Sequence, residues 1–199
     1  RDVAPSRGLG DVYKRQPIEG LHENLANADA SVYSIMDMID NLDNYPEDLT
    51  GKKVVVVGGG AVGLDVVEFF APRGAETTII EMMPIIGNGL DASSTASMKE
   101  CMSKHHVTQM VNTALMKVNP HSFLVKYDGK EEELPFDYGF VCLGMKAHTP
   151  IWEAIEQGFE GENTEVINIG DSVRARRIID GTDAGRHLVL NTLERLGYL

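Results

Sequence analysis

Three glycines, spaced as Gly58-x-Gly60-x-x-Gly63, are the residues whose types and spacing most directly indicate chemistry. Gly58 would allow a tight turn, Gly60 would let the backbone approach a diphosphate, and Gly63 would let a helix pack closely on a sheet. Unpaired N–H groups at the start of such a helix attract phosphate oxygens. The motif predicts that a dinucleotide binds along one run of residues: Gly58, Gly59, Gly60, Ala61, Val62 and Gly63.

An acidic residue, Glu81, follows the third glycine by 18 positions and ends the next expected strand. A carboxylate at this place accepts hydrogen bonds from both ribose hydroxyls of a dinucleotide and repels a 2′-phosphate. Residues 82–85 hold no Lys or Arg that could receive such a phosphate. We therefore expect NAD(H) rather than NADP(H); the alternative is a glycine turn without a ligand. A P-loop is excluded, because Leu64 and Asp65 stand where it needs Lys and Ser or Thr.

The elements around these residues follow a β-α-β pattern. Residues 54–57 are a continuous β-branched run, which is typical of a strand buried on both faces. A helical pattern then extends to residue 73, with Pro72 and Gly74 as stop signals, and residues 77–80 are expected to form the second strand. Parallel strands joined by a helix are the unit of a Rossmann-like nucleotide-binding domain, so we predict the α/β class.

Beyond Glu81 the regular alternation of strand and helix changes. After a helix expected over 92–105, four strand-like runs are separated by turn residues; these runs are 107–111, 114–118, 123–127 and 131–134. A buried strand over 138–143 then ends at Gly144. We predict a three-layer nucleotide-binding domain in which a β-meander takes the place of a crossover helix.

Three further elements are expected near the two ends of the chain. An apolar stripe predicts a helix over residues 31–42. Near the C-terminus, residues 165–169 are expected to form a strand that ends in Gly170 and Asp171. A helix should then begin between residues 178 and 183 and run to about 196.

Composition excludes several classes of function. The 199 residues carry a net charge of −12, which disfavours a nucleic-acid partner because it repels phosphates. No apolar run approaches the ~20 residues that span a bilayer. Cys101 and Cys142 have neither C-x-x-C nor zinc spacing, so they are expected to be free thiols in a reducing compartment. We expect a soluble cytoplasmic protein that acts on a small molecule, without a metal site or a membrane partner; its oligomeric state stays open.

Residues 1–16 differ from the rest of the sequence. They carry four basic and two acidic residues, show no apolar period and resemble translated sequencing-adapter read-through. Our hypothesis is that they are a foreign or disordered tail, that the natural sequence begins near Pro17 and that its upstream part is missing.

The string from residue 51 to 65 resembles the nicotinamide-binding domain of two-dinucleotide-domain flavoproteins. Residues 138–144 and 166–171 resemble two later landmarks of that group. Residues 81–84 and 176–181 resemble a narrower set, the NADH:flavin oxidoreductases related to 2,4-dienoyl-CoA reductase, 2-enoate reductase and bilirubin reductase.

The resemblance implies an NAD(H)-binding domain at 51–149 that is inserted between two halves of an FAD-binding domain. Residues 17–50 would then be a linker and helix from the FAD domain, and 150–199 would be its C-terminal part. Asp171 would hydrogen-bond the flavin ribityl chain, although Gly-Asp pairs also form ordinary turns. Gly144, which ends the first of these landmarks, and Gly170, which precedes Asp171 in the second, are further candidates for cofactor binding.

Asp65 occupies a position where many relatives carry Glu, near the expected nicotinamide; a solvated helix residue is the alternative. The resemblance implies a C-terminal fragment of an FAD-dependent NADH oxidoreductase in which NADH passes hydride to FAD. No residue of this chain is assigned a catalytic role, because hydride transfer needs positioning of the two rings rather than an acid or base.

In the full protein, the resemblance implies that electrons pass through a 4Fe–4S centre to FMN in an N-terminal (β/α)8 barrel, where a conjugated double bond is reduced. One alternative is a pyridine nucleotide-disulfide reductase or an NADH oxidase with the same two-domain core. Another is a non-catalytic NAD(H)-binding module.

Overall fold

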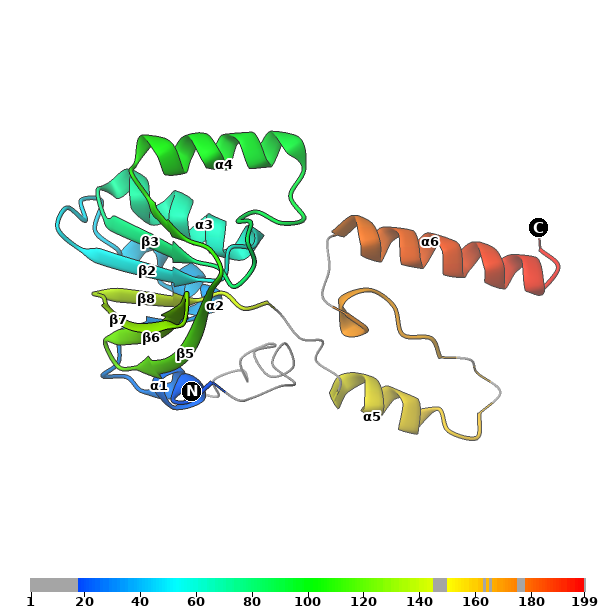
Figure 1. Ribbon diagram of the computed structural model, residues 1–199. Helices are drawn as coiled ribbons and strands as arrows, with labels where there is room; N and C mark the ends of the chain where they lie inside the picture. The colour runs from blue at the N-terminus through cyan, green and yellow to red at the C-terminus, as the bar shows by residue number, and fades with distance from the viewer. Residues whose placement is uncertain (1–17, 145–149, 163, 165, 175–177, 199) are drawn as a thin grey trace. The chain divides into compact units, whose positions relative to one another are not determined.

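A computed structural model describes residues 18–144, 150–162, 164, 166–174 and 178–198 (Figure 1). The expected tail at residues 1–16 lies outside this range. The chain divides into two units, whose described residues run from 18 to 144 and from 150 to 198.

A five-stranded parallel sheet with the strand order β1-β8-β2-β3-β4 forms the centre of the first unit. Its strands are β1 (Val32–Tyr33), β2 (Lys53–Val57), β3 (Glu76–Ile80), β4 (Thr108–Met110) and β8 (Tyr138–Val141). β2 lies between β8 and β3, with Val57 opposite Val141 on one side and Ile80 on the other. Because neighbours flank β2 on both edges and side chains bury both of its faces, the β-branched run predicted it correctly.

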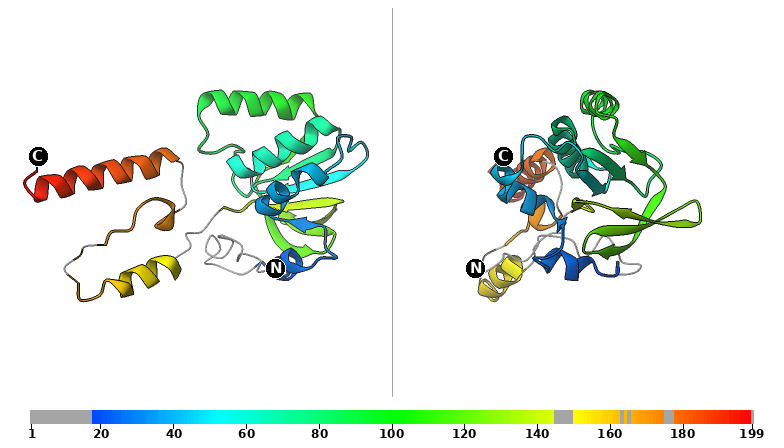
Figure 2. Two further views of the ribbon diagram at one scale, coloured as in Figure 1. Left: turned by 180° about the vertical axis from the view of Figure 1, so that it is seen from behind. Right: turned by 90° about the vertical axis from the view of Figure 1, so that its left-hand side faces the viewer.

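Two helices cover one face of this sheet, as two of the views show (Figures 1 and 2). They are α3 (Ala61–Phe70), which a 3-10 turn (Ala71–Arg73) extends, and α4 (Ala92–Lys104). Gly74 ends the 3-10 turn with a φ of +85°, a conformation that favours glycine, so the expected stop is confirmed. Asp91 caps α4, since its carboxylate accepts hydrogen bonds from the N–H groups of Ser93 and Ser94.

An antiparallel three-stranded sheet covers the other face (Figure 2). It consists of β5 (Thr113–Asn119), β6 (Ser122–Tyr127) and β7 (Lys130–Pro135). The predicted three-layer α/β arrangement with a β-meander is therefore confirmed. The assignment of residues 107–111 to the meander was wrong, because β4 pairs in parallel with β3 and completes the central sheet. Asn112, with a φ of +51°, follows β4 before the chain enters β5.

The segment that precedes the glycine motif also departs from expectation. Instead of one helix over 31–42, the chain forms β1, α2 (Ile35–Asp40) and a 3-10 turn (Leu42–Asn44), after a short helix α1 (Leu21–Ala26). Ser34 stops the helix from starting earlier: its hydroxyl accepts from the Asp37 N–H, and the Asp37 carboxylate accepts from the Ser34 N–H at 2.7 Å. Val32 and Tyr33 instead pair with β8.

The second unit contains α5 (Pro150–Gly158), a 3-10 turn (Gly170–Ser172) and α6 (Ile178–Arg195). The expected C-terminal helix is confirmed, whereas α5 was not expected from the sequence. The predicted strand over 165–169 was wrong for residues 166–169, which have no regular structure. A strand needs a hydrogen-bonded neighbour, and no strand occurs among the described residues from 150 to 198.

Burial differs between the two units. The first has an apolar core around Phe70 and Phe140, whose ring centroids lie 5.0 Å apart. Among the described residues of the second unit, none is buried. Within the parts of the chain that the structure describes, no helix is both long enough and apolar enough to pass through a bilayer.

The core predicts which substitutions destabilise the first unit. Phe70 is 0% exposed and packs between α3 and the sheet, so Phe70→Ala should lower the free energy of unfolding by about 3–5 kcal/mol. Tyr127→Ala, at a position that is 48% exposed, should change it by less than about 1 kcal/mol. Denaturant unfolding followed by circular dichroism measures both; equal losses would show that Phe70 does not anchor this core.

Candidate functional site

The turn after β2 and the first turn of α3 each contain a position that only glycine can occupy. Gly58 has a φ of +107°, and a Cβ there would overlap with the carbonyl oxygen of Cys142, the residue after β8. A Cβ at Gly63 would overlap with the carbonyl oxygen of Gly58. These contacts give Gly58 and Gly63 the two structural roles that the sequence predicts for them, the tight turn and the close approach of the helix.

Gly60 differs from these two glycines. It has an ordinary φ of −80°, and a Cβ there would meet no atom within 4 Å. The fold itself therefore does not require glycine at this position, and the space next to it is open. A diphosphate that approaches the backbone fits this opening, where α3 begins with Ala61 and Val62 and presents the partial positive charge of its N-terminus. We call residues Gly58–Gly63 the cradle.

Glu81 is placed beside the cradle by the pairing of β3 with β2, which puts Ile80 opposite Val57. Its carboxylate accepts two hydrogen bonds from main-chain groups: Oε2 accepts from the Gly59 N–H at 2.6 Å, and Oε1 accepts from the Met83 N–H at 2.7 Å. The structure thus brings Glu81 and the glycine turn together, as the sequence predicts. Both contacts fix the orientation of the carboxylate before any ligand is present.

Gly144 lies three residues beyond Val141, the last residue of β8. Because β8 is the neighbour of β2, the carboxyl ends of these strands share one edge of the sheet. In open α/β sheets, ligands bind outside the carboxyl ends of the strands. Gly144 has a φ of +102°, a conformation that favours glycine, and its role in cofactor binding stays a prediction.

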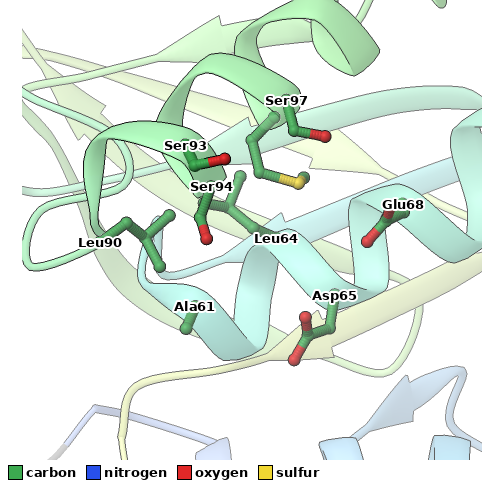
Figure 3. A pocket seen from close by; sticks show the side chains of 9 residues that line it. Ala61, Leu64, Asp65, Glu68, Leu90, Ser93, Ser94 and Ser97 are labelled. Carbon is green, nitrogen blue, oxygen red and sulfur yellow. The ribbon is translucent and has the colours of Figure 1, made fainter.

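A hollow of about 300 Å³ lies between α3 and α4, and Ala61, the first residue of α3, is part of its lining (Figure 3). Its polar lining consists of hydroxyls from α4 and carboxylates from α3; the polar residues are Asp65, Glu68, Ser93, Ser94 and Ser97. Partial burial raises the pKa of Asp65 above its ordinary value, and the nearby Glu68 carboxylate raises it further. Asp65 is nevertheless exposed, which fits either of the two roles expected for it.

The second unit has a hollow of its own, with a volume of about 220 Å³. It is lined by the 3-10 turn, the residues beside it and the first turns of α6: Asn168, Ile169, Gly170, Asp171, Val173, Arg174, Asp180, Gly181 and Ala184. Gly170 has a φ of +69° and faces Gly181 at the start of α6. The predicted pair Gly170 and Asp171 therefore lies in the wall of a hollow rather than on a plain convex turn.

The two cysteines are free thiols in the structure. Burial raises the pKa of the Cys142 thiol to about 12, so this side chain is not a thiolate at neutral pH. Burial also raises the pKa of Cys101, with the nearby Glu68 as a second cause. Within the described ranges, no three His, Cys, Asp or Glu side chains are grouped so that they could hold a metal ion.

The sequence did not indicate two main-chain groups that shape the site. The Met83 N–H holds Glu81, and the Gly87 N–H donates to the Gly59 carbonyl oxygen at 2.7 Å. The residue types of 82–87 do not indicate these contacts, because any residue other than proline offers a main-chain N–H donor. The glycine at position 87, with a φ of +78°, was the one available signal.

Known proteins resemble this chain at low sequence identity. An NADH oxidase of Thermoanaerobacter brockii is 25% identical over 154 residues, which are 77% of this chain and 23% of that protein. A bilirubin reductase of Mediterraneibacter gnavus is 28% identical over 148 residues, which are 74% of this chain and 22% of that protein. The solved complex of 2-naphthoyl-CoA reductase with 2-naphthoyl-CoA has a TM-score of 0.67 and 24% identity, over 86% of this chain and 24% of that one.

This chain therefore spans about a quarter of the length of these proteins. The profile of one family, described as pyridine nucleotide-disulphide oxidoreductase, matches residues 10–175. That stretch contains the cradle, Glu81 and the Gly170-Asp171 pair. The chain belongs to the pyridine nucleotide-disulphide oxidoreductase family, a family of FAD-dependent NAD(P)H oxidoreductases.

Proposed function

We propose that this chain is the NAD(H)-binding part and the C-terminal FAD-binding part of an FAD-dependent NADH oxidoreductase. The observation that carries the proposal is the contrast among the glycines of the cradle. Gly58 and Gly63 are required by the fold, whereas Gly60 borders open space at a helix N-terminus. At a helix N-terminus, a position without a side chain leaves room for a ligand to approach the backbone, and a diphosphate has the matching charge.

The residues of the first unit suit NAD(H). The cradle would hold the diphosphate, and Glu81 would accept hydrogen bonds from the ribose hydroxyls. A carboxylate has about four acceptor sites, and the two main-chain N–H groups occupy only two of those on Glu81. The remaining sites are available for two hydroxyls, whereas a 2′-phosphate would place negative charge next to the carboxylate. These features support NADH over NADPH.

The residues of the second unit suit part of a flavin site. Gly170 and Asp171 line a hollow next to the first turn of α6, and we assign Asp171 to the ribityl chain of FAD. When both cofactors are bound, NADH supplies a hydride and FAD accepts it. The part of this chain is to bind and orient the two cofactors, which needs no acid or base from its own residues.

For the whole protein we propose reduction of a conjugated carbon–carbon double bond in a small-molecule substrate, in the cytoplasm. One relative is named a bilirubin reductase, and a structure with the same fold is a 2-naphthoyl-CoA reductase. Substrate, FMN and a 4Fe–4S centre would then bind to a part of the protein outside this sequence. Residues 17–50 and 150–199 would belong to its FAD domain, and residues 51–149 to its NAD(H) domain.

A second candidate, an NADH oxidase, is favoured by the relative of that name. The two differ in what reoxidises the flavin: molecular oxygen for the oxidase, an unsaturated organic acceptor for the reductase. Oxygen consumption by the full-length protein with NADH and no organic acceptor distinguishes them. If the protein consumes oxygen in stoichiometric amounts with the NADH it oxidises, at its full turnover rate and without an organic acceptor, the second candidate replaces the first.

The open space at Gly60 gives a direct test of the cradle. Gly60→Ala should change the stability by less than about 1 kcal/mol, because the added methyl group meets no protein atom. Affinity for NADH should fall at least about tenfold, because the same methyl group occupies the place of the diphosphate. Gly158→Ala in α5, which also adds a methyl group in open space, is the matched control and should leave NADH affinity unchanged. Calorimetric titration in which both variants bind NADH equally well would contradict the cradle.

Glu81 gives a test of cofactor preference. Wild type should bind NADH more tightly than NADPH, and Glu81→Ala should lower NADH affinity by about tenfold or more, since two charge-assisted hydrogen bonds are lost. The preference for NADH over NADPH should shrink, because the repulsion of the 2′-phosphate is removed. Glu76→Ala, at the exposed first residue of β3, serves as the control. Tighter binding of NADPH by the wild type would show that the assignment is wrong.

Asp171 gives a test of the flavin assignment. In the full-length protein, Asp171→Ala should reduce the FAD that stays bound after purification, measured as absorbance near the flavin maximum per mole of protein. Asp183→Ala, an exposed position of α6 that does not line the hollow, should retain FAD as wild type does. Full flavin content in the Asp171 variant would remove this residue from the FAD site.

A further inference from the structure

The glycine turn contains two peptide groups whose orientation decides where its N–H donors point. In the Gly58–Gly59 peptide, the N–H donates to Glu81 Oε2 at 2.6 Å, while the carbonyl faces Gly63. In the Gly59–Gly60 peptide, the carbonyl accepts from the Gly87 N–H at 2.7 Å. Because a trans peptide is planar, its N–H points opposite to its carbonyl. The contact with Gly87 therefore directs the Gly60 N–H away from the loop that holds Gly87.

Both of these contacts come from one short segment, Glu81–Gly87, which follows β3. Its first residue is fixed to the neighbouring strands: the Glu81 N–H donates to the Met110 carbonyl at 2.8 Å, and its own carbonyl accepts from the Thr113 N–H at 2.9 Å. Its far end is fixed by packing. Ile86 is 9% exposed and belongs to the main apolar core, and a Cβ at Gly59 would lie 3.1 Å from the Ile86 Cγ1.

We propose that the segment Glu81–Gly87 is a brace that orients the Gly58–Gly59 and Gly59–Gly60 peptide groups of the cradle before the dinucleotide binds, and that Ile86 is a positioning residue for the diphosphate. This inference rests on the proposed NAD(H) site and adds residues that hold the glycine turn without touching the ligand. Glu81 then acts twice, through the ribose hydroxyls and through the Gly59 peptide. Donors that are already oriented need not be ordered on binding, so the brace raises affinity without touching the ligand.

The two actions can be separated with a ligand that lacks the ribose hydroxyls. The probe is an NADH analogue built on 2′,3′-dideoxyadenosine, and its affinity is compared with that of NADH in the full-length protein. Ile86→Ala should weaken both ligands to the same degree, by about tenfold, which is the order expected for one lost hydrogen bond. Glu81→Ala should weaken NADH more than the analogue, but it should still weaken the analogue severalfold.

Three controls keep the result specific. Ile39→Ala, on α2 and 50% exposed, lies outside this segment and should bind both ligands as wild type does. Met102→Ala removes an apolar side chain that is 4% exposed in the same core, on α4, so it controls for a general loss of stability. Ile86→Val, which keeps most of the packing, should recover most of the affinity. If Ile86→Ala loosens the glycine turn, the Gly59 N–H should also exchange its hydrogen with solvent faster than in the wild type.

The outcomes that overturn the brace are distinct from those that overturn the NAD(H) site. If wild type binds no NADH, the proposed function fails. If wild type binds NADH while Ile86→Ala keeps full affinity, or Met102→Ala loses as much, the site stands and the brace is wrong. An effect of Glu81→Ala on NADH alone, with the dideoxy analogue unaffected, would likewise limit Glu81 to its ribose contact.

Discussion

The contact on which the rest of the site depends is the approach of the Gly58 carbonyl to Gly63. Because position 63 has no side chain, α3 lies so close to the turn after β2 that this carbonyl fills the place of a Cβ. The first turn of α3 therefore lies at the carboxyl edge of the sheet, and Glu81 lies at the same edge because it follows β3, the neighbour of β2. One steric condition thus brings together the start of α3, to which we assign the diphosphate, and the Glu81 carboxylate, to which we assign the ribose, although they come from different elements.

The negative charge of the chain bears on how it would bind an anionic dinucleotide. A net charge of −12 repels an anionic dinucleotide at long range, and Asp65 and Glu68 lie on the same helix as the cradle. Salt at physiological strength screens exposed charges beyond about 8 Å, so groups within hydrogen-bond distance decide affinity. Residues 58–63 and 81–87 contain no Lys or Arg, so the donors that these two described segments offer are main-chain N–H groups. A main-chain donor that turns away presents a carbonyl oxygen instead, which repels phosphate, so the orientation of each peptide group has an energetic consequence.

The sequence predicted those parts of the fold that follow from local residue types. The β-branched run, the glycine spacing and the stop at Gly74 each express a local steric preference, and all three are found in the structure. The errors concern residues 31–33, 107–111 and 166–169, and each is a matter of strand pairing. Whether an extended segment joins one sheet, another sheet or none depends on a partner that is distant in the sequence, so periodicity alone does not decide it.

The same distinction applies within the site. The sequence predicted Glu81 because its contacts with the Gly59 and Met83 N–H groups are made by its side chain, and side chains are what distinguish the residues of a sequence. The Gly87 N–H was not found, because any residue other than proline offers an N–H and only the path of the chain aims it. The sequence does not single out Ile86 for a related reason: it contacts the glycine turn only through packing, since a Cβ at Gly59 would lie 3.1 Å from its Cγ1. Residues 82–87 can therefore accept many apolar substitutions as long as Gly87 keeps its positive φ and the residue before it stays in the core.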